Sequence, residues 1–144
     1  MDAYTTYLDI AVFSMLGIMS LITFTIWLER LSCYRNCNID DYGNKKELEI
    51  VLSNNLTIIS TIAANAPYVG LLGTVFGIIL TFYTIGVVGV TDSNAMMMGL
   101  ALALKATAFG LIVAIPAIVF HNYLVRRMEV MIAQWEIRYE DQKN

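Results

Sequence analysis

Three long stretches that are almost free of charge constrain what this chain can fold into. Residues 10–28 and 50–91 carry no charged side chain, and Lys105 is the only charged residue in 93–125. A helix needs about 20 apolar residues to cross roughly 30 Å of hydrocarbon. The chain is 58% hydrophobic with a mean hydropathy of +0.63, whereas soluble domains are about 45–50% apolar. We therefore expect an integral membrane protein.

The charge gaps predict an all-α protein that crosses the membrane three times. Trp27 lies at the end of the first gap, where aromatic side chains favour the interface. The connection over residues 86–94 is too short for more than a tight hairpin. The N-terminus lacks the basic start of a cleaved signal peptide, so we expect the first span to be retained. A single membrane domain over 1–144 then has spans at about 8–28, 67–90 and 95–120, with cytoplasmic segments at 29–66 and 121–144.

The cytoplasmic segments carry helical patterns of their own. Asp40, Asp41 and Gly43 indicate a turn, and Asn44 is placed to cap a following helix. Apolar residues then recur at helical spacing from 48 to 66, which predicts an amphipathic helix continuing past Pro67 into the second span. A second apolar stripe predicts a polar-faced helix after the third span. It consists of Leu124, Met128, Met131, Trp135 and Tyr139.

The basic residues orient the chain. Eight of the nine lysines and arginines fall in the two cytoplasmic segments, and only Lys105 lies elsewhere. The N-terminus and the hairpin carry acidic residues alone. The positive-inside rule therefore predicts an outer N-terminus and a cytoplasmic C-terminus.

Several functional classes are excluded or disfavoured. A net charge of −3 gives no basic surface for nucleic acid. Cys33, Cys37 and His121 fall short of the four ligands of a zinc site, so we predict no metal and no cofactor. Two cysteines in a cytosolic segment are expected to remain reduced thiols. No nucleotide-binding loop, nucleophile elbow or carboxylate pair is present, and we expect no enzymatic activity.

Small residues recur at helical spacing in the second and third spans. Such residues allow helices to approach closely where lipid provides no hydrophobic drive for association. One interpretation is that these faces only pack the two spans together. The candidate packing residues are Gly70, Gly73, Gly77, Gly110 and Ala114, in stripes that also include Ala103, Thr107 and Ala117.

Threonines lie beside these stripes. Thr74, Thr81 and Thr84 share a face of the second span, and Thr107 lies in the third. Each hydroxyl could bond to a carbonyl of its own helix without any function. If several copies assembled around an axis, Thr74 and Thr107 could instead line a shared lumen. Both interpretations remain open from spacing alone.

Lys105 is the most unusual residue of the spans. A lysine at the centre of a span costs about 2.5–3.5 kcal/mol unless it snorkels or pairs. We expect no acidic residue within a span, so the counter-charge would come from another chain, a water-filled cavity or deprotonation. Snorkelling to an interface is the alternative. Lys105 lies about 200° from Thr107 at about 100° per residue, so both cannot point into one narrow pore.

The segments APYVGLLGTVFGI and KATAFGLIVAIPA resemble the paired signature of the MotA/TolQ/ExbB proton-channel family, and the ExbB branch most. The resemblance implies a homopentameric ring in the bacterial inner membrane that encloses single-span partners of the ExbD or TolR type. Each partner carries an aspartate that gains and loses protons. Thr74 and Thr107 match the threonines that face the lumen in that family, and Thr81 and Lys105 are further candidates for the proton pathway.

The implied function is a motor subunit, driven by the proton-motive force, that energises outer-membrane transport through a TonB-like partner. A TolQ-like role in envelope maintenance, a non-conducting membrane scaffold and a small solute channel are the alternatives. One departure matters: many relatives carry a glutamate where this chain has Leu102. The role of that glutamate therefore does not transfer to this chain.

Overall fold

The computed structural model describes residues 2–89 and 93–141, and the regular structure in these ranges is entirely helical. Residues 90–92, at the tip of the expected hairpin, lie outside the described residues, as do Met1 and 142–144. The elements follow in the order α1 (Asp2–Asn36), η1 (Ile39–Asp41), α2 (Lys45–Ser53), α3 (Leu56–Val88) and α4 (Ser93–Asp141).

Three of these helices are long and apolar enough to cross a membrane, which confirms the all-α, three-span class. Each of these helices extends beyond its expected span at the end that lies away from the connection between α3 and α4. α3 runs through Pro67 and α4 runs through Pro116 without ending. The three candidate spans are Thr6–Asn36, Leu56–Val87 and Met96–Tyr139.

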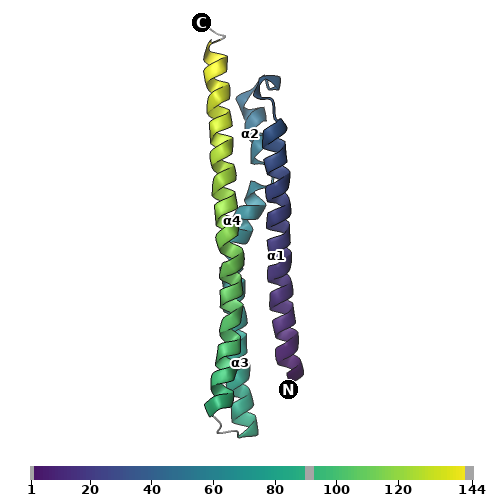
Figure 1. Cartoon of the computed structure of the whole chain (residues 1–144), viewed down its shortest axis with the longest axis vertical. Coiled ribbons are helices and arrows are strands. Elements are labelled where there is room, and N and C mark those ends of the chain that lie inside the picture. Colours follow the sequence, from purple (N-terminus) through teal and green to yellow (C-terminus); the bar gives the residue numbers. More distant parts are fainter. Residues whose placement is uncertain (1, 90–92, 142–144) are drawn as a thin grey trace.

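α1 and α4 lie side by side and run in the same direction, whereas α3 is antiparallel to both (Figure 1). Two ring contacts set the register of the parallel pair. The rings of Phe13 and Phe109 meet edge to face with centroids 4.9 Å apart. Further along both helices, Trp27 stacks on Phe120 at 4.5 Å. Because both contacts advance toward the C-terminal end of each helix, α1 and α4 are parallel along the membrane part of the chain.

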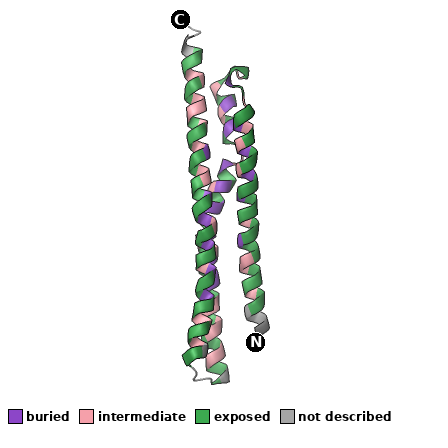
Figure 2. Ribbon diagram, viewed as in Figure 1, coloured by how far each residue is buried: buried purple, intermediate pink, exposed green. Residues whose placement is uncertain are grey.

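Most of the surface of this bundle is exposed, and the buried residues follow the lines where helices meet (Figure 2). Large apolar side chains point outward along all three long helices, for example Leu21, Ile79 and Leu104. A surface this apolar is suited to lipid or to further copies of the chain rather than to water.

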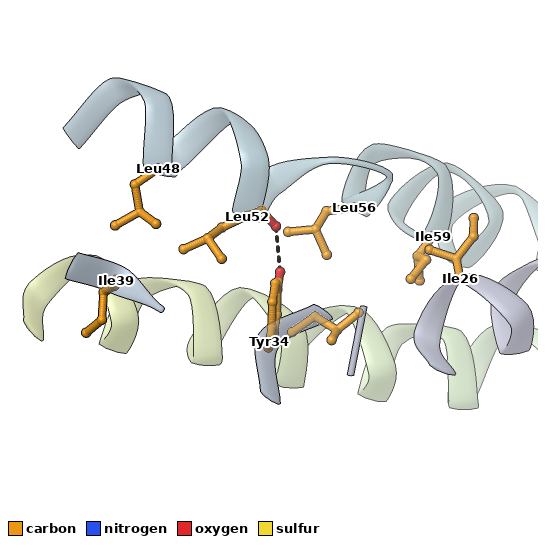
Figure 3. Packing of buried hydrophobic residues seen from close by; sticks show 8 residues of the cluster. Ile26, Tyr34, Ile39, Leu48, Leu52, Leu56 and Ile59 are labelled. Carbon is orange, nitrogen blue, oxygen red and sulfur yellow. Dashed lines mark hydrogen bonds between the residues drawn. The ribbon is translucent and has the colours of Figure 1, made fainter. Parts of the chain in front are cut away.

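The ends of the long helices that lie away from the α3–α4 connection share a core of their own with α2 (Figure 3). Leu48, Leu52 and Ile59 are fully buried there, against Ile26 of α1 and Leu124 of α4. The apolar stripe expected over residues 48–66 is therefore confirmed as a buried face. The expected cap is confirmed as well, since the Asn44 side chain accepts a hydrogen bond from the Lys46 backbone N–H over 3.0 Å.

The prediction of one continuous amphipathic helix over this stripe is wrong. The chain leaves the helical path at Asn54 and Asn55, between α2 and α3. Asn55 has φ 62, in the left-handed region that asparagine tolerates better than most residues. Leu52 and Leu56 nevertheless stay on the same buried face on either side of the break.

α1 provides the hydrogen bonds that make this break possible. The last carbonyls of a helix have no partner within it. Arg30 Nη1 donates to the Val51 carbonyl over 3.1 Å, and the Tyr34 hydroxyl donates to the Leu52 carbonyl over 2.6 Å. Both donors are themselves buried. Two backbone carbonyls in the last turn of α2 thus accept hydrogen bonds from side chains near the C-terminal end of α1.

Candidate functional site

Glycines bring the backbones of α3 and α4 into direct contact. A Cβ built on Gly70 would lie 2.6 Å from the Ala106 carbonyl oxygen. A Cβ on Gly110 would lie 2.8 Å from the Ala66 carbonyl oxygen. Any side chain at either position would have to displace backbone, so these two glycines set how close the helices approach.

This line of close contact between α3 and α4, the α3–α4 seam, continues toward the connection between the two helices. α1 packs against one side of it. A Cβ on Gly77 would lie 2.8 Å from Ala103 Cβ. A Cβ on Gly73 would lie 2.8 Å from Ala106 Cβ and 3.0 Å from Val12 of α1. The remaining candidate for packing, Ala114, is buried and belongs to a cluster with Leu16 and Ala66.

Two threonine hydroxyls meet within this seam. Thr74 of α3 is buried, at 7% exposure, and its Oγ1 is hydrogen-bonded to Oγ1 of Thr107 of α4. Thr74 Oγ1 also lies 3.2 Å from the carbonyl oxygens of Gly70 and Ala103. Thr107 Oγ1 lies 3.4 Å from the Gly70 carbonyl oxygen. The structure therefore brings together the two threonines that the sequence singled out.

The chemistry of this pair follows from the hydroxyl group, which has one hydrogen to donate and two lone pairs to accept. One hydroxyl donates to the other, and the second donates to a backbone carbonyl. Either threonine can take either role, because Thr74 and Thr107 both reach the Gly70 carbonyl. Thr107 is only half-buried, so the pair is open to the molecular surface on its side. With both hydrogens engaged in this way, the pair presents lone pairs that accept from a guest group, and it presents a donor once the second hydroxyl turns away from its backbone carbonyl.

Thr81 lies apart from this pair. It is two turns, about 10 Å, further along α3, and its Oγ1 donates to the Gly77 carbonyl of its own helix over 2.8 Å. Its methyl group also fills the space above Gly99, where a Cβ would lie 2.7 Å from Thr81 Cγ2. These contacts of Thr81 are explained equally well by helix packing and by a role in a proton pathway.

Lys105 is exposed and lies away from the α3–α4 seam. The structure thus places Lys105 and Thr107 on different faces of α4. The helix that holds the first candidate span, Thr6–Asn36, carries Asp9 and Glu29 at the two ends of its uncharged run.

Cys33 and Cys37 lie at and just after the C-terminal end of α1, are partly buried, and are both free thiols. Burial raises the pKa of the Cys37 thiol, and a hydrogen bond with Tyr42 opposes that shift. A thiol of this kind is mostly protonated at neutral pH and is a poor metal ligand. No group of three histidine, cysteine or carboxylate side chains suited to a metal ion occurs within residues 2–89 and 93–141.

Sequence reasoning missed Arg30 and Tyr34 as structural residues. Arg30 is 6% exposed, and its Nη2 also pairs with Glu29 at 2.7 Å. The available signal was a charged pair directly after an apolar span, followed by an aromatic residue one turn later. This pattern does not identify the hydrogen-bond acceptor, because the Val51 carbonyl lies 21 residues after Arg30, on the far side of a turn.

Comparison with known proteins agrees with this arrangement. A biopolymer transport protein of Helicobacter pylori named ExbB-like 2 is 47% identical over 129 residues, which is 90% of this chain and 86% of that protein. The biopolymer transport protein ExbB of Aquifex aeolicus is 45% identical over 136 residues, or 94% and 92% of the two chains. The Tol-Pal system protein TolQ of Pseudomonas aeruginosa is 38% identical over 84 residues, or 58% and 36%.

A family model provides the second comparison. The model of the MotA/TolQ/ExbB proton channel family matches residues 40–137, which include α2, α3 and most of α4. The matched region contains the glycine seam and the paired hydroxyls of Thr74 and Thr107. With its three apolar helices, the chain is thus a multi-pass inner-membrane protein. It belongs to the MotA/TolQ/ExbB proton channel family.

Proposed function

We propose that this chain is the ring-forming subunit of a proton-driven motor, and that the hydrogen-bonded hydroxyls of Thr74 and Thr107 line its proton pathway. The observation that carries the proposal is that pair, held by a glycine seam in the segment that defines the family. The ring would be a homopentamer with α3 and α4 around the axis. The exposed apolar faces of α1 and α4 would then meet lipid and neighbouring copies.

The partner in this proposal is a single-span protein of the ExbD or TolR type, which brings a membrane-embedded carboxyl group to the hydroxyl pair. A protonated carboxyl group can both donate and accept, and a carboxylate can only accept. Hydroxyls that switch between donor and acceptor fit both states. Burying an unpaired charge costs several kcal/mol, so only the neutral form passes the apolar wall of the ring. Proton uptake and release would then drive movement of the partner against the ring.

The relatives favour an ExbB-type system over a TolQ-type one. The relatives matched over most of their own length bear the ExbB name, at 86% and 92% for the two described above, whereas the TolQ relative is matched over 36%, as some longer ExbB proteins are over 25% and 34%. We therefore propose that the motion is passed to a TonB-like partner and energises transport at the outer membrane. The basic residues of the cytoplasmic segments support an outer N-terminus and a cytoplasmic C-terminus. In this scheme the chain catalyses no covalent chemistry.

Proton flux in vesicles containing this chain and its single-span partner tests the proposal. We expect Thr74→Val with Thr107→Val to abolish flux while the complex still assembles. Thr84→Val is the matched control, because its hydroxyl only bonds to the Leu80 carbonyl of α3 over 2.8 Å. Normal flux in the double variant would overturn the assignment of the pair. Absence of flux from the unaltered complex would favour a non-conducting scaffold, and conductance by this chain alone would favour a solute channel.

A further inference from the structure

Two opposite charges on α1 and α4 have no partner in the structure. Asp9 and Lys105 are both exposed, and neither takes part in a salt bridge or hydrogen bond with the residues that the structure describes. Asp9 is the only acidic residue in 3–28, and Lys105 is the only basic residue in 93–125. Each is therefore the single opposite charge available to the other within the apolar parts of α1 and α4.

The register of the two helices places these charges at the same level. α1 and α4 are parallel, and Phe13 meets Phe109 with ring centroids 4.9 Å apart. Asp9 precedes Phe13 by four residues, and Lys105 precedes Phe109 by four residues. Both charges thus lie about 6 Å from the same ring contact, measured along their helices in the same direction.

The two residues also lie on sides of their helices that turn toward each other. Asp9 is seven residues from Leu16, and positions seven apart share a helix face. Leu16 is 2% exposed and packs into the bundle. Lys105 lies one turn from Phe109, which touches α1. A lysine has a long flexible stem that can carry its ammonium group across to a neighbouring helix.

The surroundings favour pairing. The uncharged run of α1 begins directly after Asp9, and Lys105 lies within the apolar part of α4, so both charges border an apolar environment. Opposite charges attract more strongly beside lipid than in water, because the effective dielectric constant is lower. An ionisable residue in a membrane segment characteristically pairs with another. Asp9 is therefore a candidate counter-charge for Lys105 within the same chain.

We propose that Asp9 and Lys105 of one chain form an ion pair that fastens the outer end of α1 to α4. The pair positions the first span and neutralises the charge of Lys105. Lys105 lies on a different face of α4 from Thr107. Lys105 is then a positioning residue and lies outside the proton pathway. This inference rests on membrane insertion and helix register and is independent of the proposed motor function.

Cross-linking in native membranes tests the pair directly. The native cysteines are first removed as Cys33→Ser and Cys37→Ser. Asp9→Cys and Lys105→Cys are then introduced together, and membranes containing this variant are treated with a short bis-methanethiosulfonate reagent. We expect both thiols to be consumed in a product of monomer size. The control variant carries Ala11→Cys in place of Asp9→Cys, together with Lys105→Cys. Residue 11 lies about 200° around α1 from residue 9, so the two cysteines of the control should not be linked within one chain. A ladder of linked dimers would overturn the proposal in favour of pairing between copies, and thiols that stay unlinked would overturn it altogether.

Charge exchange gives a second test that does not depend on cysteine variants. Asp9→Asn and Lys105→Met alone should each lower the amount of assembled protein in the membrane about threefold or more, because each leaves one charge unpaired. The exchange Asp9→Lys with Lys105→Asp, and the double neutral variant, should both restore it. If the amount of assembled protein in each double variant is instead lowered by the product of the two single-variant factors, the two residues are uncoupled and the proposal fails. Neither experiment measures proton flux, so its outcome is separate from that of the motor proposal.

Discussion

The Tyr34 hydroxyl of α1 donates to the carbonyl oxygen of Leu52, the second-to-last residue of α2, over 2.6 Å (Figure 3). This bond joins the inner end of the first span to the place where the chain breaks before re-entering the membrane as α3. Tyr34 is 5% exposed and Leu52 is fully buried, so water has little access to this carbonyl.

Tyr34→Phe should therefore destabilise the core around Leu52. The substitution removes one donor and leaves the Leu52 carbonyl buried without its partner, which costs about 1–3 kcal/mol. Thermal unfolding of the detergent-solubilised protein would measure the effect as a lowered Tm. Tyr7→Phe is the control, since Tyr7 is 71% exposed. Equal Tm values for the two variants would show that the Tyr34 bond contributes nothing.

Gly70→Ala should disrupt the α3–α4 seam. The added Cβ would approach the Ala106 carbonyl oxygen to 2.6 Å, and backbone cannot yield as a flexible side chain can. Overpacking of this kind costs about 1–3 kcal/mol. Gly86→Ala in the same helix is the matched control, because nothing lies within 4 Å of its Cβ position. Size-exclusion profiles and Tm values should separate the two variants, and a Gly70→Ala protein that matches Gly86→Ala would contradict the assigned close approach.

Thr74 and Thr107 should act as one unit in proton flux. Because their hydroxyls bond to each other, loss of either disturbs the other, and the effects of two valine substitutions should not add. A double-mutant cycle of flux rates should give a coupling energy of about 0.5–3 kcal/mol. Serine at either position keeps the hydroxyl and should retain flux. Strictly additive losses, or serine variants as inactive as valine, would separate the two side chains.

Cys37 should react slowly with alkylating reagents. The thiolate is the reactive form, and burial raises the pKa of this thiol above its ordinary value. In a Cys33→Ser background, the alkylation rate at pH 8 should be lower in the folded protein than in denaturant. The rate should then rise toward the unfolded value as the pH passes through the raised pKa. A folded protein that reacts faster than the unfolded chain at pH 8 would refute the raised pKa.

The sequence contained enough information for the spans and the buried faces. Gaps in charge mark the apolar stretch within each long helix, although α1 and α4 continue past them. The helical spacing of Leu48, Leu52 and Ile59 identifies the face that is buried on α2 and α3. The Asn44 cap was equally local, since acceptor and donor lie two residues apart. These features depend only on neighbours along the chain.

The break at Asn55 could not be predicted in the same way. Its left-handed backbone is permitted because Arg30 and Tyr34, remote in sequence, satisfy the carbonyls of the preceding turn. The equal position of Asp9 and Lys105 along the parallel helices α1 and α4 could not be predicted from the sequence for a similar reason. It follows from the contact of Phe13 with Phe109, and sequence periodicity describes one helix without fixing its register against another.

The unbroken course of α4 has a mechanical consequence. From Thr107 to Asp141 this single helix extends about 51 Å. A tilt of about 5° at the seam would swing the far end sideways by about 4 Å, since displacement grows with the length of a stiff arm. Small rearrangements around the hydroxyls would in this way appear at the C-terminal end of α4 as movements large enough for another protein to sense.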